Sequence, residues 1–208
     1  MDFRFDLFLY VVIVISAVFH EYAHALVAYR LGDTTAKDAG RLTLNPFVHL
    51  DLVGTVLVPL FLLLTSGIFI GWAKPVPYNP FALRDKRYGS LKVGVAGPLS
   101  NLIIAVVLGI IIRLAGSFGL IGGAVSPMFL QFLGLIVYVN IFLAVFNLLP
   151  FPPLDGSKIF ADLFPRFSRN FMQLGFLGIF LALFLAFFIL SPIADFLFRI
   201  IVGNGLAL

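Results

Sequence analysis

Residues 7–29 read LFLYVVIVISAVFHEYAHALVAY, and this stretch decides the fold class. It is longer than the roughly 20 predominantly apolar residues that a helix needs to cross a bilayer. The segment HEYAH within it sets His20, Glu21 and His24 among apolar neighbours. Because ionisable groups inside a span cost about 2.5–3.5 kcal/mol each on insertion scales, such a cluster indicates a functional site.

The composition of the whole chain is that of a membrane protein. Of its 208 residues, 61% are hydrophobic and 12% are charged, whereas an average soluble domain has about 45–50% and about 25%. This balance argues against a soluble fold, a disordered chain and a nucleic-acid binder, although the net charge is +4. The chain has no cysteine, so cysteine metal sites and disulfides are excluded.

Three further stretches are apolar and long enough to span a bilayer. They comprise residues 93–112, 128–149 and 170–194. We therefore predict an all-α polytopic membrane protein with four full transmembrane helices. Ser191-Pro192 is expected to break the last helix and leave a short amphipathic tail. No repeat or linker divides the chain, so we expect one domain over residues 1–208, with a motif-bearing core at 7–156.

The basic residues predict the orientation of these spans. Eleven of the 14 Lys and Arg residues follow the first span, precede the second or precede the last. The other three are Arg4, Arg113 and Arg199. Since cytoplasmic loops carry the excess of Lys and Arg, the first group is expected inside and the N-terminus outside.

A fifth uncharged stretch, residues 52–73, is interrupted by Gly and Pro residues. If the basic segments on both its sides are cytoplasmic, it must dip into the bilayer and return, which predicts a re-entrant segment. The alternative is a fifth ordinary span, which would put the RDKR segment at 84–87 outside. The Pro-rich residues 71–80 that follow predict a short extended edge strand, or else a surface loop. Such an edge could pair with an unwound substrate by strand addition.

The HEYAH segment has the spacing of a metal site. Residues four apart lie on one helical face, so His20 and His24 can bind one ion, and Glu21 could take a proton from a bound water. Helix-to-helix hydrogen bonding is the simpler interpretation. A hydrolytic zinc site needs a third protein ligand. With no Cys and no second Glu, the candidates are His49 and the nine Asp residues.

Asp155 is the preferred third ligand because of its place in NLLPFPPLDG, residues 147–156. The third span returns there to the side on which the first span ends, so Asp155 and His24 can meet at one depth. A helix-terminating turn is the alternative role for this segment. Asn101 in AGPLSN could offer an amide inside the bundle, and His49 in NPFVHLDLVGT could orient a ligand His. Helix packing and helix capping are the alternatives for these two residues.

Together, HEYAH, NPFVHLDLVG, GWAKPVP, AGPLSN and NLLPFPPLDG resemble the site-2 protease family of intramembrane zinc metalloproteases. The pattern is most similar to the small prokaryotic branch without PDZ or CBS domains. The resemblance implies that His20, His24 and Asp155 bind one catalytic zinc and that Glu21 is the general base. It also implies that Asn147 helps to hold the substrate or the oxyanion.

The resemblance further implies substrates that are transmembrane segments of other proteins, cut near the cytoplasmic face of a prokaryotic inner membrane. Two alternatives remain open for the function. One is a catalytically inactive scaffold of the same fold that binds transmembrane helices. The other is a metal-ion permease. The sequence implies no oligomeric state.

Overall fold

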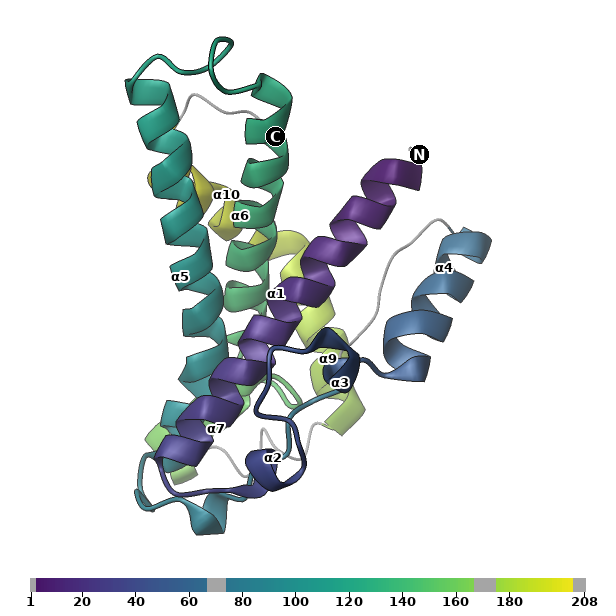
Figure 1. Cartoon of the computed structure of the whole chain (residues 1–208). Helices are drawn as coiled ribbons and strands as arrows, with labels where there is room; N and C mark the ends of the chain where they lie inside the picture. The colour runs from purple at the N-terminus through teal and green to yellow at the C-terminus, as the bar shows by residue number, and fades with distance from the viewer. Residues whose placement is uncertain (1–2, 67–73, 167–174, 204–208) are drawn as a thin grey trace.

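The computed structural model describes residues 3–66, 74–166 and 175–203 (Figure 1). Four of its helical segments are long and apolar enough to cross a membrane, which confirms the predicted number of spans. These segments are Phe5–Arg30, Gly89–Ser117, Pro127–Asn147 and Leu183–Val202. The regular secondary structure of the described residues is helical, and their one β pairing is an isolated bridge between Ile121 and Val125.

Three long helices form the frame of the molecule: α1 (Phe3–Arg30), α5 (Gly89–Ser117) and α6 (Pro127–Asn147). Helix α5 packs against both α1 and α6, and α10 (Ser191–Val202) covers the far side of α5 and α6 (Figure 1). The core between them is small and apolar. Its buried members are Ala105, Ile112, Ala115, Leu130, Val137, Ile141, Ala194, Phe198 and Val202.

The close approach of α5 to α10 depends on a glycine. A Cβ atom at Gly109 would collide with the side chain of Ile201, so the two backbones can approach only where α5 lacks a side chain. Small residues at helix contacts serve this purpose in membrane bundles, where van der Waals packing drives helix association.

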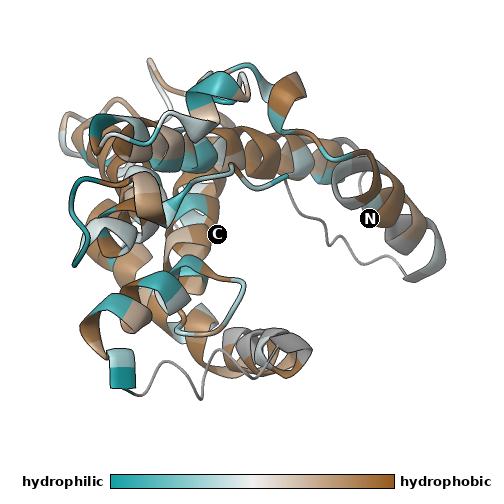
Figure 2. Cartoon of the chain, turned by 90° about the horizontal axis from the view of Figure 1, so that it is seen from below, coloured by the Kyte–Doolittle hydropathy of each residue, from teal (hydrophilic) through white to brown (hydrophobic). Residues whose placement is uncertain are grey.

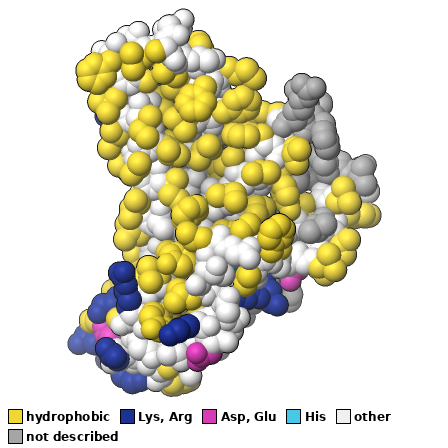
Figure 3. Space-filling view, viewed as in Figure 1, with side chains coloured by type: hydrophobic (Ala, Val, Ile, Leu, Met, Phe, Trp, Pro, Cys, Tyr) yellow, Lys and Arg dark blue, Asp and Glu magenta, His cyan; other side chains and the backbone are white. Residues whose placement is uncertain are grey.

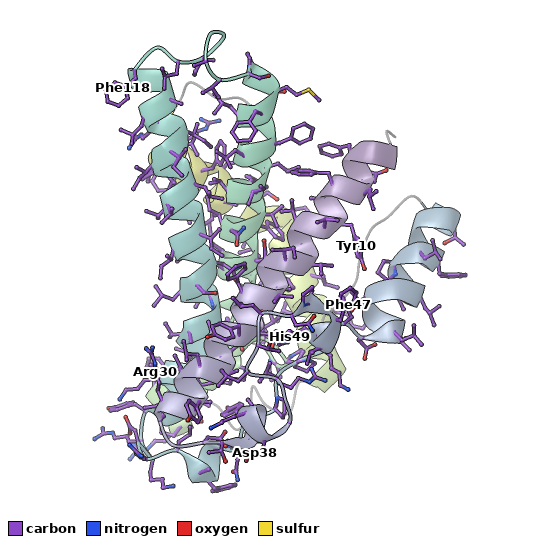
Figure 4. All side chains as sticks on the ribbon, in the orientation of Figure 1. Tyr10, Arg30, Asp38, Phe47, His49 and Phe118 are labelled. Atoms are coloured by element: carbon purple, nitrogen blue, oxygen red, sulfur yellow. The ribbon has the colours of Figure 1, made fainter. Side chains whose placement is uncertain are left out.

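The polar residues gather at one end of this bundle. The long helices are predominantly hydrophobic, and the hydrophilic segments lie in the connections (Figure 2). In Figure 3 the Lys and Arg side chains surround the lower end of the molecule, while the face above it is mostly hydrophobic. Arg30 and Asp38 mark that end, and Phe118 lies at the opposite end (Figure 4). The charges therefore lie as expected for a protein with one basic membrane face.

The last span differs from its predicted form. The helix that carries it comprises α9 (Gly175–Leu185), a π-helical stretch η3 (Ala186–Leu190) and α10, and its membrane-spanning part, Leu183–Val202, ends at Val202 instead of 194. Residues 170–174 of the predicted span lie outside the described residues. The backbone stays helical at Ser191-Pro192, and Pro192 lies just after the π-helical stretch η3, the kind of local adjustment that lets a membrane helix tolerate a proline.

Short helices build the connection between α1 and the fifth apolar stretch. Asn45 caps α3 (Pro46–His49) by accepting a hydrogen bond from the N–H of Phe47. Asp51 caps the π-helix η1 (Leu52–Leu57) in the same way, and α4 (Val58–Ser66) continues from it. The Tyr10 hydroxyl donates to the Thr55 carbonyl over 2.8 Å and ties α1 to η1 (Figure 4). The rest of the predicted re-entrant segment, residues 67–73, lies outside the described residues.

Residues 74–79 form a strap without regular secondary structure that crosses to α1, and the edge strand predicted for this segment stays a prediction. The strap is held at both ends. The N–H of Lys74 donates to the His49 carbonyl over 3.0 Å, and the N–H of Asn79 donates to Asp33 Oδ2 over 2.6 Å. Burial alone would raise the pKa of the Asp33 carboxyl, but hydrogen bonds from Thr35 and Asn79 hold that pKa below its usual range.

The remaining short helices flank the basic end of the bundle. They are α2 (Thr35–Asp38), η2 (Pro80–Ala82) and α7 (Asp155–Leu163). Helix α7 packs against α5. This contact brings the start of α7 next to the residues of α1 that the sequence singled out.

Candidate metal centre

The two histidines of HEYAH lie on the face of α1 that is covered by α5, and both are buried. His20 Nδ1 lies 2.6 Å from Asn101 Oδ1, and His24 Nδ1 lies 2.6 Å from the carbonyl oxygen of Val93. A carbonyl oxygen can only accept a hydrogen bond, so each Nδ1 carries the proton. Each Nε2 is therefore left with a lone pair, which is the state in which a histidine binds a metal.

Asp155 completes a triangle of electron-pair donors. Its Oδ2 lies 2.9 Å from Nε2 of His20 and 2.9 Å from Nε2 of His24. The two Nε2 atoms are 3.0 Å apart. Only a shared proton or a metal cation can hold three such atoms together in a buried site. Ligands on a tetrahedral zinc are about 3.3 Å apart at bond lengths of about 2.0 Å, so the donor set fits such an ion. These three residues could hold a metal.

The turn between α6 and α7 places Asp155 in the triangle. A Cβ atom at Gly156 would collide with the carbonyl groups of Leu148 and Leu149, so only glycine allows α7 to start this close to the end of α6. The ammonium of Lys158 lies 2.7 Å from Asp155 Oδ1 and directs Oδ2 to the histidines.

Helix α5 leaves room for the triangle at Gly97. A Cβ atom there would lie 2.5 Å from His20 Nε2 and in contact with His24 Nε2. Any side chain at this position would occupy the space in front of the two lone pairs. Gly97 is thus a condition for the site as well as for helix packing.

A pocket of about 100 Å³ opens on the triangle. Its walls come from α1, α5, the strap, the end of α6, the α6–α7 turn and α7. The lining residues are His20, Glu21, His24, Pro75, Val76, Tyr78, Val93, Asn147, Pro153, Asp155 and Lys158. The ammonium of Lys158 also lies 5.3 Å from the centre of the Tyr78 ring, which links α7 to the strap.

The carboxylate of Glu21 faces this pocket and is held by the strap. Its Oε2 accepts a hydrogen bond from the N–H of Val76 over 2.7 Å. Because Pro75 and Pro77 have no N–H, Val76 supplies the one amide donor of the sequence PVP. Glu21 Oε1 has no hydrogen-bond partner in the part of the chain that the structure describes, so it is left for a further partner.

Asn147 and Asn101 lie at different places around the triangle. Asn147 lines the pocket, and its Nδ2 donates to the Leu143 carbonyl over 2.9 Å. Asn101 lies behind His20. His49 is buried away from the triangle, its Nε2 donates to the Thr43 carbonyl over 2.8 Å, and its Nδ1 has no hydrogen-bond partner among the described residues (Figure 4).

Sequence reasoning missed three residues of this site: Lys158, Val76 and Asn140, which bonds Asn101. Lys158 had a detectable signal, since a residue three positions after Asp155 lies on the same helical face. Val76 acts through its backbone, and Asn140 is one polar residue in an apolar span. Neither position differs in the sequence from an ordinary loop or packing residue.

The family model described as peptidase family M50 matches residues 8–191. A putative zinc metalloprotease of Bacillus subtilis, YwhC, is 43% identical over 159 residues, which cover 76% of this chain and 69% of the relative. The putative zinc metalloprotease Rip2 of Mycolicibacterium smegmatis is 34% identical over 142 residues, covering 68% of this chain and 51% of the relative. No solved structure matches the chain significantly.

Replacing Gly97→Ala tests the space in front of the histidines. Alanine normally favours a helix over glycine by about 1 kcal/mol, but here its methyl group would overpack the triangle. Overpacking costs about 1–3 kcal/mol, which predicts about 5–150-fold weaker binding of a divalent cation. Titration of the purified protein with Co²⁺, followed by visible absorption, measures this loss.

The matched control is Gly116→Ala on the same helix, where the added Cβ would be 3.8 Å from its nearest neighbour, Ile121 Cδ1. This variant should bind Co²⁺ like the wild type. Equal affinities for all three proteins would show that the ion does not bind between His20 and His24.

Proposed function

The chain belongs to peptidase family M50, the site-2 protease family, and on that premise we propose that it is a zinc-dependent intramembrane endopeptidase. Its substrates are peptide bonds within or near the transmembrane segments of other membrane proteins. The observation that carries the proposal is the triangle of His20 Nε2, His24 Nε2 and Asp155 Oδ2 beside the Glu21 carboxylate. The chain spans about half to two thirds of its curated relatives.

His20, His24 and Asp155 would hold the zinc ion in this proposal, because three protein ligands are the usual set of a hydrolytic zinc site. A bound zinc ion supplies Lewis-acid chemistry: it polarises a carbonyl group and lowers the pKa of water toward neutrality. The Nδ1 contacts to Asn101 and Val93 keep both imidazoles in the tautomer that presents Nε2. Lys158 neutralises the second oxygen of Asp155.

Glu21 is the general base. It accepts a proton from the attacking water and delivers it to the leaving amine, as a positioned carboxylate can do. Its place beside His20 in the pocket and the fixed position of Oε2 on Val76 support this role, because Oε1 remains for the proton.

Asn147 binds the substrate near the reacting carbonyl. One of its two amide protons is committed to the Leu143 carbonyl. The second proton is available for a substrate oxygen, because a primary amide carries two donors. Its position in the pocket wall supports this assignment.

The strap presents the substrate backbone. A transmembrane helix keeps its carbonyl groups in internal hydrogen bonds, so it must unwind locally before hydrolysis. In the proposal, residues 74–79 act as the edge to which the unwound segment adds. The three pocket-lining residues Pro75, Val76 and Tyr78 support this role, because they place the strap beside the triangle.

Residues 52–73 form a re-entrant segment in this proposal. The support is the hydrogen bond between Lys74 N–H and the His49 carbonyl, which brings the chain back to the level at which it left α3. Irregular backbone at membrane depth is tolerated where it is packed in protein or lines a wet cavity.

The protein is an integral membrane protein, and we assign its basic end to the cytoplasm of a prokaryotic cell, with the N-terminus outside. The collection of Lys and Arg at that end supports the orientation (Figure 3). The metal centre then lies near the cytoplasmic face, from which water can reach it.

Glu21→Gln tests the catalytic role. The variant should retain zinc, because Glu21 is not a ligand, but it should lose activity by about 100-fold or more, the contribution of a general base. The variant would replace the native copy in cells, and mass spectrometry of their membranes would count new peptide termini inside transmembrane segments.

His20→Ala is the matched control and should lose both zinc and the new termini. An inactive scaffold or a permease would give the same membrane peptides for the wild type, Glu21→Gln and His20→Ala. Undiminished cleavage by Glu21→Gln would show that another group is the base.

The orientation can be tested by single cysteines, because the chain contains none of its own. Ser126→Cys lies in the loop before α6 and Lys37→Cys lies in α2, and both positions are exposed. A membrane-impermeant maleimide should label Ser126→Cys in intact cells and Lys37→Cys only after permeabilisation. The reverse pattern would place the metal centre at the outer face.

A further inference from the structure

Behind His20, a chain of buried polar side chains crosses three membrane helices. It contains Ser16 on α1, Asn101 on α5 and Asn140 on α6. Asn101 and Asn140 are both 0% exposed. Polar groups are costly at this depth, and they mark function or helix association in membrane proteins.

Hydrogen bonds connect these polar side chains without a break, from His20 to Asn140. Asn101 Oδ1 lies 2.6 Å from His20 Nδ1, and Asn101 Nδ2 donates to Asn140 Oδ1 over 2.8 Å. Asn101 Nδ2 also reaches the Ser16 carbonyl over 3.3 Å. Asn140 Nδ2 in turn donates to the Ile136 carbonyl over 2.9 Å and to Ser16 Oγ over 3.0 Å.

The Ile136 carbonyl, at the end of this hydrogen-bond network, fixes which way the amide groups of Asn140 and Asn101 face. The Ile136 carbonyl can only accept, so the amide nitrogen of Asn140 must face it and Asn140 Oδ1 must face Asn101. Asn101 must then turn its nitrogen to Asn140 and its oxygen to His20. The opposite orientation of Asn101 would set its oxygen against Asn140 Oδ1 and the Ser16 carbonyl, leaving buried acceptors without donors.

We propose that Asn140 is a positioning residue for the metal ligand His20. It fixes the orientation of the Asn101 amide, and Asn101 then holds His20 as the tautomer with a proton on Nδ1 and a lone pair on Nε2. This inference rests on the proposed zinc function. It deepens that function by placing a determinant of zinc affinity on α6, a helix that supplies none of the three ligands.

The two histidines differ in this respect. His24 Nδ1 is held by the Val93 carbonyl, a backbone group that no substitution removes. The tautomer of His20, in contrast, is set by the side chains of Asn101 and Asn140. Changes at Asn140 therefore act on His20 and leave the tautomer of His24 unaffected.

The test measures Zn²⁺ affinity of the full chain in detergent by competition with a chelator. Loss of an outer-shell partner costs about 10–100-fold in metal affinity, and Asn140 lies one residue farther out. We therefore expect about a tenfold loss for Asn140→Leu, which keeps the branched shape and the number of heavy atoms and removes the amide. Val137→Ala, in the buried core of the same helix, is the control for general loosening of α6 and should bind zinc like the wild type.

The variant Asn101→Asp, as a second background, shows whether Asn140 acts by orienting the Asn101 amide or only by holding the helices together. A carboxylate accepts through both oxygens and needs no orientation, and Asn140→Leu also removes the acceptor Oδ1 that would oppose it, so in the Asn101→Asp background the additional substitution Asn140→Leu should cause no loss of zinc affinity. If Asn140→Leu does not fold, Asn140→Ala replaces it in both backgrounds. The chain has only three histidines, so ring ¹⁵N shifts of labelled protein can also report a mixed His20 tautomer in Asn140→Leu.

Zinc binding by Asn140→Leu as tight as that of the wild type would overturn the inference. So would an equal loss in Val137→Ala, or an undiminished effect of Asn140→Leu in the Asn101→Asp background. A wild-type chain that binds no zinc would instead refute the proposed function, so the two failures are distinguishable.

Discussion

The structure depends on the convergence of three electron-pair donors in a buried site. Nε2 of His20, Nε2 of His24 and Oδ2 of Asp155 lie 2.9–3.0 Å from one another. Without a cation or a shared proton, these atoms would repel one another in a medium of low dielectric. Two glycines allow these atoms to lie so close together. Gly97 on α5 leaves space beside the histidines, and Gly156 lets α7 begin against the end of α6.

Some of the surrounding groups orient the three donor side chains, and others form the wall of the pocket. Asn101 and the Val93 carbonyl set the imidazoles, and Lys158 sets the carboxylate. The strap closes the other side of the pocket and carries the hydrogen bond from Val76 to Glu21. Because this bond uses one carboxylate oxygen, the metal centre and the segment proposed to present the substrate are connected through Glu21 itself.

The sequence predicted the elements whose physics is local. Apolar length is sufficient to identify a span, and i, i+4 spacing is sufficient to put His20 and His24 on one face. Topology added Asp155, because two segments that end on one side of the membrane can meet. The predicted end of the last span was wrong because the helix continues through Pro192, where the preceding π-helical stretch accommodates the proline. Val76 and Asn140 could not be predicted, because their roles come from contacts between segments distant in the chain.

Zinc K-edge X-ray absorption of the purified chain, loaded with one equivalent of Zn²⁺, tests the central claim most directly. We predict one tightly bound zinc per chain with two imidazole nitrogens and oxygen ligands, and loss of one of those oxygen ligands in Asp155→Ala. A spectrum with three imidazoles would make His49 the third ligand and contradict the assignment of Asp155. A spectrum with one imidazole or none would contradict the metal centre as a whole.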